Sequence, residues 1–227
     1  MTTNIRPPAG QKLKRYSETT LPTTHGVLRM VVFRDGEGAQ AVEHVAMVAG
    51  DVVGADVLCR VHSECLTSEV FGSIKCDCKQ QLDRALDMIA KRGRGVVIYL
   101  RGHEGRGIGL GDKVRAYALQ EQGHDTVDAN RLLGLPDDSR DFSMVKAILD
   151  DLGVTSVSLL TNNPLKVEAL QAQGVVILQR VPLLVTASRQ ALRYLATKGE
   201  RMGHVLGPAP TTPTTPTLVA DMSFAAK

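Results

Sequence analysis

Hydrophobic and polar positions in the first third of the chain alternate as in β-strands. Short runs rich in β-branched residues extend from Val27 to Phe33, from His44 to Val48 and from Val52 to His62, separated by the turn sequences RDGEG and GD. These runs predict a meander-like, antiparallel N-terminal sheet. Residues 1–20 are polar and contain proline, so we expect a loosely ordered segment there.

The period changes from two to 3.6 residues after Asp77, which predicts a helix. One face of this helix carries the apolar side chains of Leu82, Ala85, Leu86, Ile89 and Ala90. The sequence KRGRG ends the helix, because glycine in the last turn favours termination. The apolar run VVIYL that follows, residues 96–100, predicts a buried strand.

The alternation of strands and helices continues to about residue 181. Helices are predicted over 112–122 and 144–152 and after TNNP, where Pro164 suits the first turn, and strands over 154–160 and 175–181. This pattern predicts an α/β fold: a mixed sheet covered by helices on both faces, in three layers, with an antiparallel N-terminal part. We expect a single domain over 21–206 and a disordered Pro/Thr-rich tail over 207–227.

Composition narrows the class of protein. The chain has 227 residues, 43% of them apolar, and a net charge of +3, which is too small to predict nucleic-acid binding. Its four cysteines are clustered rather than spread as in a disulfide framework, which favours a reducing compartment. No apolar run approaches eighteen residues, and the first twenty lack an apolar segment, so neither a membrane span nor a signal peptide is predicted. We therefore expect a cytoplasmic protein.

Three of the cysteines lie within the fifteen residues ECLTSEVFGSIKCDC, at positions 65, 76 and 78. A disulfide uses two thiols and a closed structural zinc site four ligands, whereas three leave one coordination position free for water or substrate. The sequence therefore predicts zinc bound by Cys65, Cys76 and Cys78. In a strand, Cys59 faces away from Arg60 and His62, so we assign it to the core.

His62 and Glu64, followed by a cysteine pair, also resemble superficially the HxE and PCxxC signature of zinc nucleobase deaminases. In this chain the two cysteines of the pair are one residue too close, and no proline precedes them. Cys65 would also have no purpose in such a site. We therefore set the deaminase interpretation aside.

A glycine-rich segment, LRGHEGRGIGLGDK, follows the predicted strand over 96–100. It matches neither the dinucleotide fingerprint nor the Walker A pattern, and glycines alone indicate only tight turns. Its position after a buried strand, together with Arg101 and Arg106, predicts phosphate binding. The later segment LPDDSRDF carries Asp137, Asp138 and Arg140, and in isolation it is typical of a solvated turn.

Together, the segments RVHSECLTSEVFGSIKCDC, LRGHEGRGIGL, KVRAYALQEQGHDTVDAN, SRDF and LLTNNPLKVEAL resemble GTP cyclohydrolase II, the first committed enzyme of riboflavin biosynthesis. The resemblance implies hydrolysis of GTP to 2,5-diamino-6-ribosylamino-4(3H)-pyrimidinone 5′-phosphate, with release of formate and pyrophosphate. It also implies one Zn²⁺ per subunit, Mg²⁺ with the triphosphate and a homodimer. Some relatives carry a fused dihydroxybutanone phosphate synthase domain, for which this chain has no room, so we expect a single activity.

Carried over residue by residue, the resemblance gives the zinc ligands as Cys65, Cys76 and Cys78. It places nucleotide contacts at Arg60, Val61, His62, Ser63, Glu64, Gln81, Glu104, Gly105, Arg106, Thr126, Thr161 and Lys166. Asp138 matches a proton acceptor and Arg140 a nucleophile toward the α-phosphorus. Because a guanidinium stays protonated, stabilisation of phosphoryl charge is the physically easier role for Arg140.

The helical spacing of Tyr117 with Val114 and Ala118 is typical of a core residue, and only the resemblance connects Tyr117 to the ring chemistry. Lys79 stands where the family usually has glycine after CDC, which puts a charged side chain beside the predicted metal site.

A nucleotide-binding module stabilised by zinc, without turnover, is the alternative from another class of protein. Such a module would close the fourth zinc position with Cys59 or His62. A hydrolase leaves that position to water. The fourth position therefore separates the two hypotheses.

Overall fold

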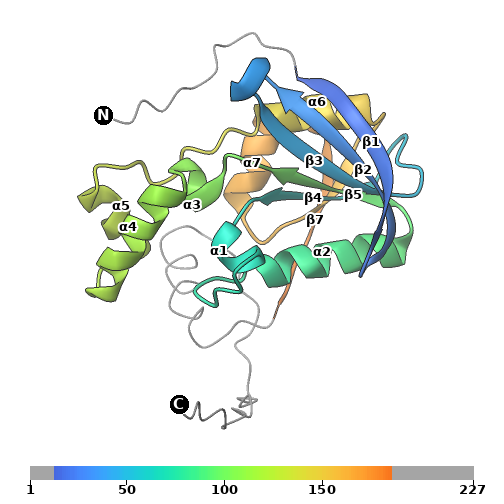
Figure 1. Ribbon diagram of the computed structural model, residues 1–227. Coiled ribbons are helices and arrows are strands. Elements are labelled where there is room, and N and C mark those ends of the chain that lie inside the picture. The colour runs from blue at the N-terminus through green and yellow to red at the C-terminus, as the bar shows by residue number, and fades with distance from the viewer. Residues whose placement is uncertain (1–12, 186–227) are drawn as a thin grey trace, which may run out of the picture.

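The computed structural model describes residues 13–185, and within them seven strands form one mixed sheet in the order β1-β2-β3-β5-β4-β6-β7 (Figure 1). The antiparallel half contains β1 (Lys14–Thr23), β2 (Gly26–Asp35) and β3 (Val42–Ala49), with a short 3₁₀ helix (Gly38–Gln40) before β3. Strand β3 pairs antiparallel with β5 (Gly95–Leu100). The parallel half then continues through β4 (Val57–Ser63), β6 (Val157–Leu160) and β7 (Ile177–Val181).

Helices cover both faces of the sheet, so the predicted three-layer α/β fold is confirmed. Helix α2 (Cys78–Arg92) packs on one face, and α6 (Ser143–Asp151) and α7 (Pro164–Ala172) pack on the other (Figure 1). Four further helices follow strand ends or lie beside the sheet: α1 (Leu66–Glu69), α3 (Glu104–Gly107), α4 (Leu110–Glu121) and α5 (Thr126–Leu132). No helix in the described part of the chain is long and apolar enough to cross a membrane.

Local sequence explains where these helices start and stop. Gly93 ends α2 with a φ of 68°, a left-handed conformation that glycine adopts without steric cost. The Asn163 side chain accepts a hydrogen bond from the backbone N–H of Leu165, and Pro164 occupies the first turn of α7. Asp125 caps α5 in the same way. Helix α5 was not predicted, since the segment is short and lies among turn-forming residues.

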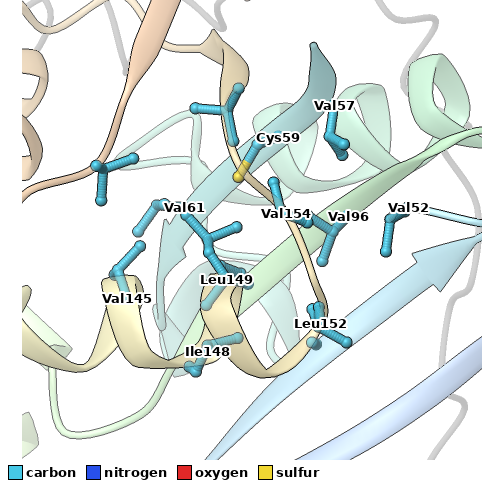
Figure 2. Packing of buried hydrophobic residues seen from close by; sticks show 14 of the residues in the cluster. Val52, Val57, Cys59, Val61, Val96, Val145, Ile148, Leu149, Leu152 and Val154 are labelled. Carbon is cyan, nitrogen blue, oxygen red and sulfur yellow. The ribbon is translucent and has the colours of Figure 1, made fainter. Parts of the chain in front are cut away.

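Two buried clusters hold the layers together. The larger cluster contains side chains from the five strands β2, β3, β4, β5 and β6 and from the helices α6 and α7. Figure 2 shows Cys59 and Val61 of β4 among the side chains of α6, with Val145 and Leu149 close by. This confirms the assignment of Cys59 to the core, where burial raises the pKa of its thiol to about 12. The smaller cluster joins the opposite face of the sheet to α2 through residues such as Ile89.

The structure corrects two expectations about the N-terminal sheet. The third predicted run is not the neighbour of the second, because β5 inserts between β3 and β4. The predicted meander therefore ends at β3, and β4 joins β5 in parallel across α2. In addition, β1 begins at Lys14, within the segment 1–20 expected to be loosely ordered. Its side chains are almost all exposed, so pairing with β2 rather than burial orders it. The expected tail over 207–227 lies outside the described residues.

Candidate active site

A pocket opens where β4, β5 and β6 end, at Ser63, Leu100 and Leu160. The carboxyl ends of parallel strands are the usual ligand site in such sheets, because the loops that follow them converge there. These loops lead into α1, α3 and α7, and α4 and α5 complete the wall. The chain thus brings its cysteine motif, its glycine-rich segment and TNNP to one place.

The three predicted thiols meet at one side of this pocket. Cys65 directly precedes α1 and Cys78 opens α2, and their Sγ atoms and that of Cys76 all lie within 4.8 Å of one another. The Sγ atoms of Cys65 and Cys76 are 3.6 Å apart, and zinc bound tetrahedrally at about 2.3 Å from each sulfur requires a separation of about 3.8 Å. The donor set therefore fits zinc. Within residues 13–185, no histidine, carboxylate or fourth thiol completes the group.

Lys113 connects these thiols to the rest of the pocket, and the sequence did not reveal this. Its Nζ donates to Cys65 Sγ at 3.1 Å, to Thr67 Oγ1 at 2.9 Å and to Glu104 Oε1. The other oxygen of Glu104 accepts from the backbone N–H of Leu66 at 2.7 Å. Burial opposes the charge of Lys113, but the bond to Glu104 and the neighbouring Cys65 raise its pKa above the ordinary value.

Hydrogen bonds within the thiol cluster favour a thiolate even without metal. Contacts of Cys65 with Cys76 and Cys78, followed by the charge of Lys113, lower the pKa of the Cys65 thiol. The bond with Cys65 raises the pKa of Cys76. A thiolate and a neutral thiol sharing hydrogen bonds are suited to metal capture, because one ligand is already deprotonated.

Arg106 adds a guanidinium to the lining of the pocket. Its backbone has a φ of 66°, which is unusual for a residue with a side chain. Both terminal nitrogens of its guanidinium are buried without a hydrogen-bond partner in the described structure. A buried guanidinium costs free energy until an anion pairs with it. Such an arrangement favours an anionic ligand.

Arg140 lies in the loop between α5 and α6 and is held by Asp138. Its Nε lies 2.9 Å from Asp138 Oδ1 and its Nη2 2.5 Å from Oδ2, a bidentate ion pair. Burial opposes the charge of Asp138, yet the bonds from Arg140 bring its pKa below the ordinary value. Arg140 and Lys166 both lie over the ring of Phe142, at 5.5 and 5.4 Å from its centre. Two cations therefore share one aromatic support.

Arg60 stands on β4 beneath the pocket, only 6% exposed. It donates to the carbonyl of Leu160 at 3.0 Å and to Oε1 of Gln81 at 2.8 Å, and its Nε is buried without a partner in the described structure. Burial lowers the pKa of Arg60 to about 10, so it remains a cation at neutral pH. Gln81 bonds Asp77 in turn, which fixes its amide.

Most of the residues predicted from the sequence line the pocket. These are Arg60, His62, Ser63, Glu64, Cys65, Cys76, Cys78, Gln81, Glu104, Gly105, Arg106, Tyr117, Thr126, Arg140, Thr161 and Lys166. Val61 and Asp138 do not: Val61 offers its carbonyl to Lys166 at 2.9 Å, and Asp138 binds Arg140. The pocket also contains residues that the sequence analysis did not select, among them Lys75, His103, Lys113, Gln120, Asn130, Asn162 and Asn163.

His103 joins two walls of the pocket. Its Nδ1 lies 3.2 Å from Ser63 Oγ, and its ring meets Phe142 edge to face at a centre separation of 5.3 Å. Burial lowers its pKa to about 4, so the ring is neutral at neutral pH. His103 lies in the segment RGHEGRG, which was selected from the sequence for its glycines and arginines and not for its histidine.

Tyr117 is a pocket residue, despite its helical spacing with core positions. The ring lies 4.7 Å from Nζ of Lys75 and 5.6 Å from Nζ of Lys113. Burial raises the pKa of its phenol, which therefore stays protonated. Lys79 points elsewhere: it sits in the first turn of α2, with its Nζ 3.0 Å from the exposed Asp83. The departure from glycine at this position therefore adds no charge to the pocket.

Comparison with known proteins identifies the family of the chain. The family model for GTP cyclohydrolase II matches residues 14–182. Riboflavin biosynthesis protein RibBA of Mycobacteroides abscessus is 54% identical over 203 residues, covering 86% of this chain and 47% of the relative. The RibBA proteins of Nocardia farcinica and Salinispora tropica are 54% and 52% identical, covering 86% and 87% of this chain and 47% and 49% of theirs.

The chain thus spans about half the length of the curated relatives it matches. Among solved structures, RibBX, a two domain 3,4-dihydroxy-2-butanone 4-phosphate synthase from A. baumannii, aligns with a TM-score of 0.41 and 20% identity, over 76% of this chain and 41% of that one. That similarity is too low to support a conclusion. By the family model and the identity to its relatives, the chain belongs to the GTP cyclohydrolase II family.

Proposed function

We propose that the chain hydrolyses GTP to 2,5-diamino-6-ribosylamino-4(3H)-pyrimidinone 5′-phosphate, releasing formate and pyrophosphate in the first committed step of riboflavin biosynthesis. The observation that carries this proposal is that one pocket contains both a three-thiol metal site and buried guanidinium nitrogens without partners in the described structure. The first suits hydrolysis of a ring, and the second suits a polyphosphate. GTP presents both targets.

Cys65, Cys76 and Cys78 would hold the zinc ion. When bound, zinc supplies a Lewis acid that makes water nucleophilic near neutral pH. Lys113 offsets part of the negative charge of the thiolates through its N–H···S bond, and the same ammonium holds Glu104 at the pocket wall. The thiols, Lys113 and Glu104 therefore form one charge-balanced unit.

Arg106, Arg140 and Lys166 would bind the triphosphate together with Mg²⁺. Their charges stabilise the negative charge that develops when the phosphoanhydride breaks. We assign Arg140 this electrostatic role, because a guanidinium that stays protonated is a poor nucleophile. We assign Asp138 the orientation of Arg140, because an aspartate with a lowered pKa is a weak proton acceptor.

Tyr117 would act on the opened ring. Its phenol, protonated and part of the pocket lining, can donate or accept the hydrogen bond that holds a formamide in place for its hydrolysis. Gln81, Thr126 and Thr161 would contact the nucleotide, as the resemblance implies. Mg²⁺, a homodimer and a cytoplasmic location stay predictions.

The alternative of a binding module without turnover requires a fourth protein ligand. Cys59 cannot supply this ligand, because its side chain lies in the core, on the face of β4 opposite to Arg60 and His62. His62 is not among the described residues that could share a metal with the thiols. The geometry therefore favours a hydrolase with a coordination position for water.

Cysteine variants test the proposal. We expect Cys65→Ser, Cys76→Ser and Cys78→Ser each to lose zinc and formate release, and Cys59→Ser to keep both. Metal analysis and a formate assay give the two readouts. In the cobalt-substituted protein, the visible spectrum should change when GTP is added. A spectrum indifferent to GTP, together with GTP recovered intact, would support the binding module instead.

A further inference from the structure

A buried carboxylate links a pocket histidine to a tyrosine on the neighbouring strand. His62 of β4 and Tyr99 of β5 are partners in the parallel register, and their rings stack with centres 5.7 Å apart. Glu69, the last residue of α1, lies between their polar ends. One of its oxygens is 2.8 Å from His62 Nε2, and the other accepts from the Tyr99 hydroxyl at 2.5 Å. The side chains of Glu69 and His62 are only 8% and 2% exposed.

This arrangement determines where the histidine carries its proton. The Tyr99 hydroxyl donates to one carboxylate oxygen, which leaves the other to accept from an imidazole N–H. Burial lowers the pKa of His62 to about 4, so the ring is neutral and has one N–H to give. That proton must lie on Nε2, facing Glu69. Nδ1 then has a free lone pair and can only accept a hydrogen bond.

The lone pair has no partner among the described residues. Nδ1 of His62 is buried without a hydrogen bond to any of them, and a buried polar atom left in this state destabilises the folded protein. His62 lines the same pocket as the thiols and Arg106, so a bound ligand can supply the missing donor. His62 does not belong to the group of possible metal ligands found among the described residues, and we therefore look for the partner among hydrogen-bond donors.

We propose that Glu69 and Tyr99 are positioning residues that hold His62 in its Nε2–H form, so that Nδ1 accepts a hydrogen bond from an N–H group of the guanine base. The identity of the base rests on the function proposed above, whereas the protonated nitrogen follows from the contacts of Glu69. In serine proteases, a carboxylate fixes the tautomer of the catalytic histidine. Its replacement by the amide leaves the geometry intact but gives the wrong tautomer, and catalysis is strongly reduced.

The test uses the zinc-loaded full chain with ¹⁵N-labelled histidine. His62 signals are assigned by their loss in His62→Gln. We expect the ¹⁵N chemical shift of His62 Nδ1 to be that of an unprotonated nitrogen, and the ¹⁵N chemical shift of Nε2 to be that of an N–H nitrogen. Glu69→Gln can present an amide N–H to Nε2, and should move the proton to Nδ1. His103 is also buried but has no carboxylate partner among residues 13–185, so it serves as the internal control, and its signals should not move.

Kinetics and ligand binding complete the test. Glu69→Gln should reduce kcat/KM for GTP at least tenfold with zinc content unchanged, and Tyr99→Phe, which keeps the carboxylate, should cost less. In the wild-type chain, α,β-methylene GTP should shift the Nδ1 resonance of His62. This measurement uses the wild-type chain alone, so it is valid even if the Glu69→Gln variant does not fold. A proton on Nδ1 in the wild type, or an Nδ1 signal indifferent to the nucleotide, would overturn the proposal.

The two proposals fail in different ways. The tautomer is read without turnover, so a wild-type chain that shows Nε2–H and the nucleotide-induced shift, but releases no formate, would refute the reaction and keep the positioning role. A chain that turns GTP over with His62 protonated on Nδ1 would keep the reaction and refute the role of Glu69.

Discussion

Ser139 binds the backbone of Arg106 twice: its N–H and its hydroxyl both donate to the Arg106 carbonyl, at 3.0 and 3.2 Å. Two segments far apart in sequence are joined by this contact, the glycine-rich segment with Arg106 and the loop with Arg140. Gly107, the residue after Arg106, has a φ of 89° and lies against Ser139. The cations proposed to bind the triphosphate are therefore set relative to one another by backbone contacts.

The first prediction concerns Gly107. A Cβ at this position would lie 2.6 Å from Ser139 Oγ and 3.0 Å from its carbonyl carbon, and the φ is unfavourable for alanine. We expect Gly107→Ala to slow pyrophosphate release at least tenfold and to reduce stability by about 1–3 kcal/mol. Gly111→Ala is the matched control, since a Cβ there meets nothing within 4 Å. Equal behaviour of the two variants would show that the docking of the loops is unimportant.

The second prediction concerns the pair of Lys113 and Glu104, whose side chains are 9% and 7% exposed. Lys113→Met leaves a buried carboxylate without its cation, and we expect a loss of roughly 3–5 kcal/mol in the free energy of unfolding. Adding Glu104→Gln should recover a good part of that loss, because the uncompensated charge is removed. Urea denaturation of the two single variants and the double variant measures the coupling. Simple additivity would argue against a coupled pair.

A third prediction separates charge from covalent chemistry at Arg140. Arg140→Ala should slow pyrophosphate release by roughly 10²–10³-fold, because one charge at the reacting phosphate is lost. Arg140→Lys should recover part of this rate, since it keeps the charge without the bidentate bond to Asp138. Arg131→Ala removes a nearby, largely exposed ion pair with Asp137 and should have little effect. If lysine were as inactive as alanine, the nucleophilic role would regain support.

The fourth prediction is a pH dependence of stability. Burial, and then the charge of Arg101, lower the pKa of His44 to about 4. In the unfolded chain this histidine binds a proton below about pH 6.5. The unfolded state therefore holds more protons between these values, and stability falls as the pH drops from about 6.5 toward 4. His62 and His103 act in the same direction.

His44→Gln isolates one of these groups. In urea titrations between pH 4.5 and 7, the variant should lose less stability on acidification than the wild type, by up to about 1.4 kcal/mol per pH unit. Acid also protonates the metal-binding thiolates, but equally in both proteins, so the difference between the two slopes reports His44. Parallel slopes would mean that His44 titrates alike in the folded and unfolded chains.

The elements predicted from the sequence are those whose signal is local. The apolar face of α2, its glycine stop, and Pro164 at the start of α7 depend on neighbours in the chain, and all were found. Strand β1 was missed because its side chains are exposed and its order comes from pairing with β2. The insertion of β5 between β3 and β4 depends on the whole sheet, and no alternation of residues encodes it.

The same distinction holds for the site. The spacing of the cysteines was enough to predict a three-thiol group, and the structure brings these thiols together. Lys113, His103 and Glu69 were missed, because each has a partner at least thirty residues away in sequence: Cys65 for Lys113, Ser63 for His103 and Tyr99 for Glu69. A lysine in a helical pattern is usually solvated, and only the packed structure shows that Lys113 is buried.

The most direct test of the proposed reaction follows the carbon and the phosphates of GTP together. The zinc-loaded chain is incubated with Mg²⁺ and GTP carrying ¹³C at C8, and the products are followed by ¹³C and ³¹P NMR. We expect the label to appear in formate, with one pyrophosphate and one pyrimidine 5′-phosphate formed for each formate. Label that remains in the guanine ring while phosphate or pyrophosphate accumulates, or GTP that is bound but recovered unchanged, would contradict it.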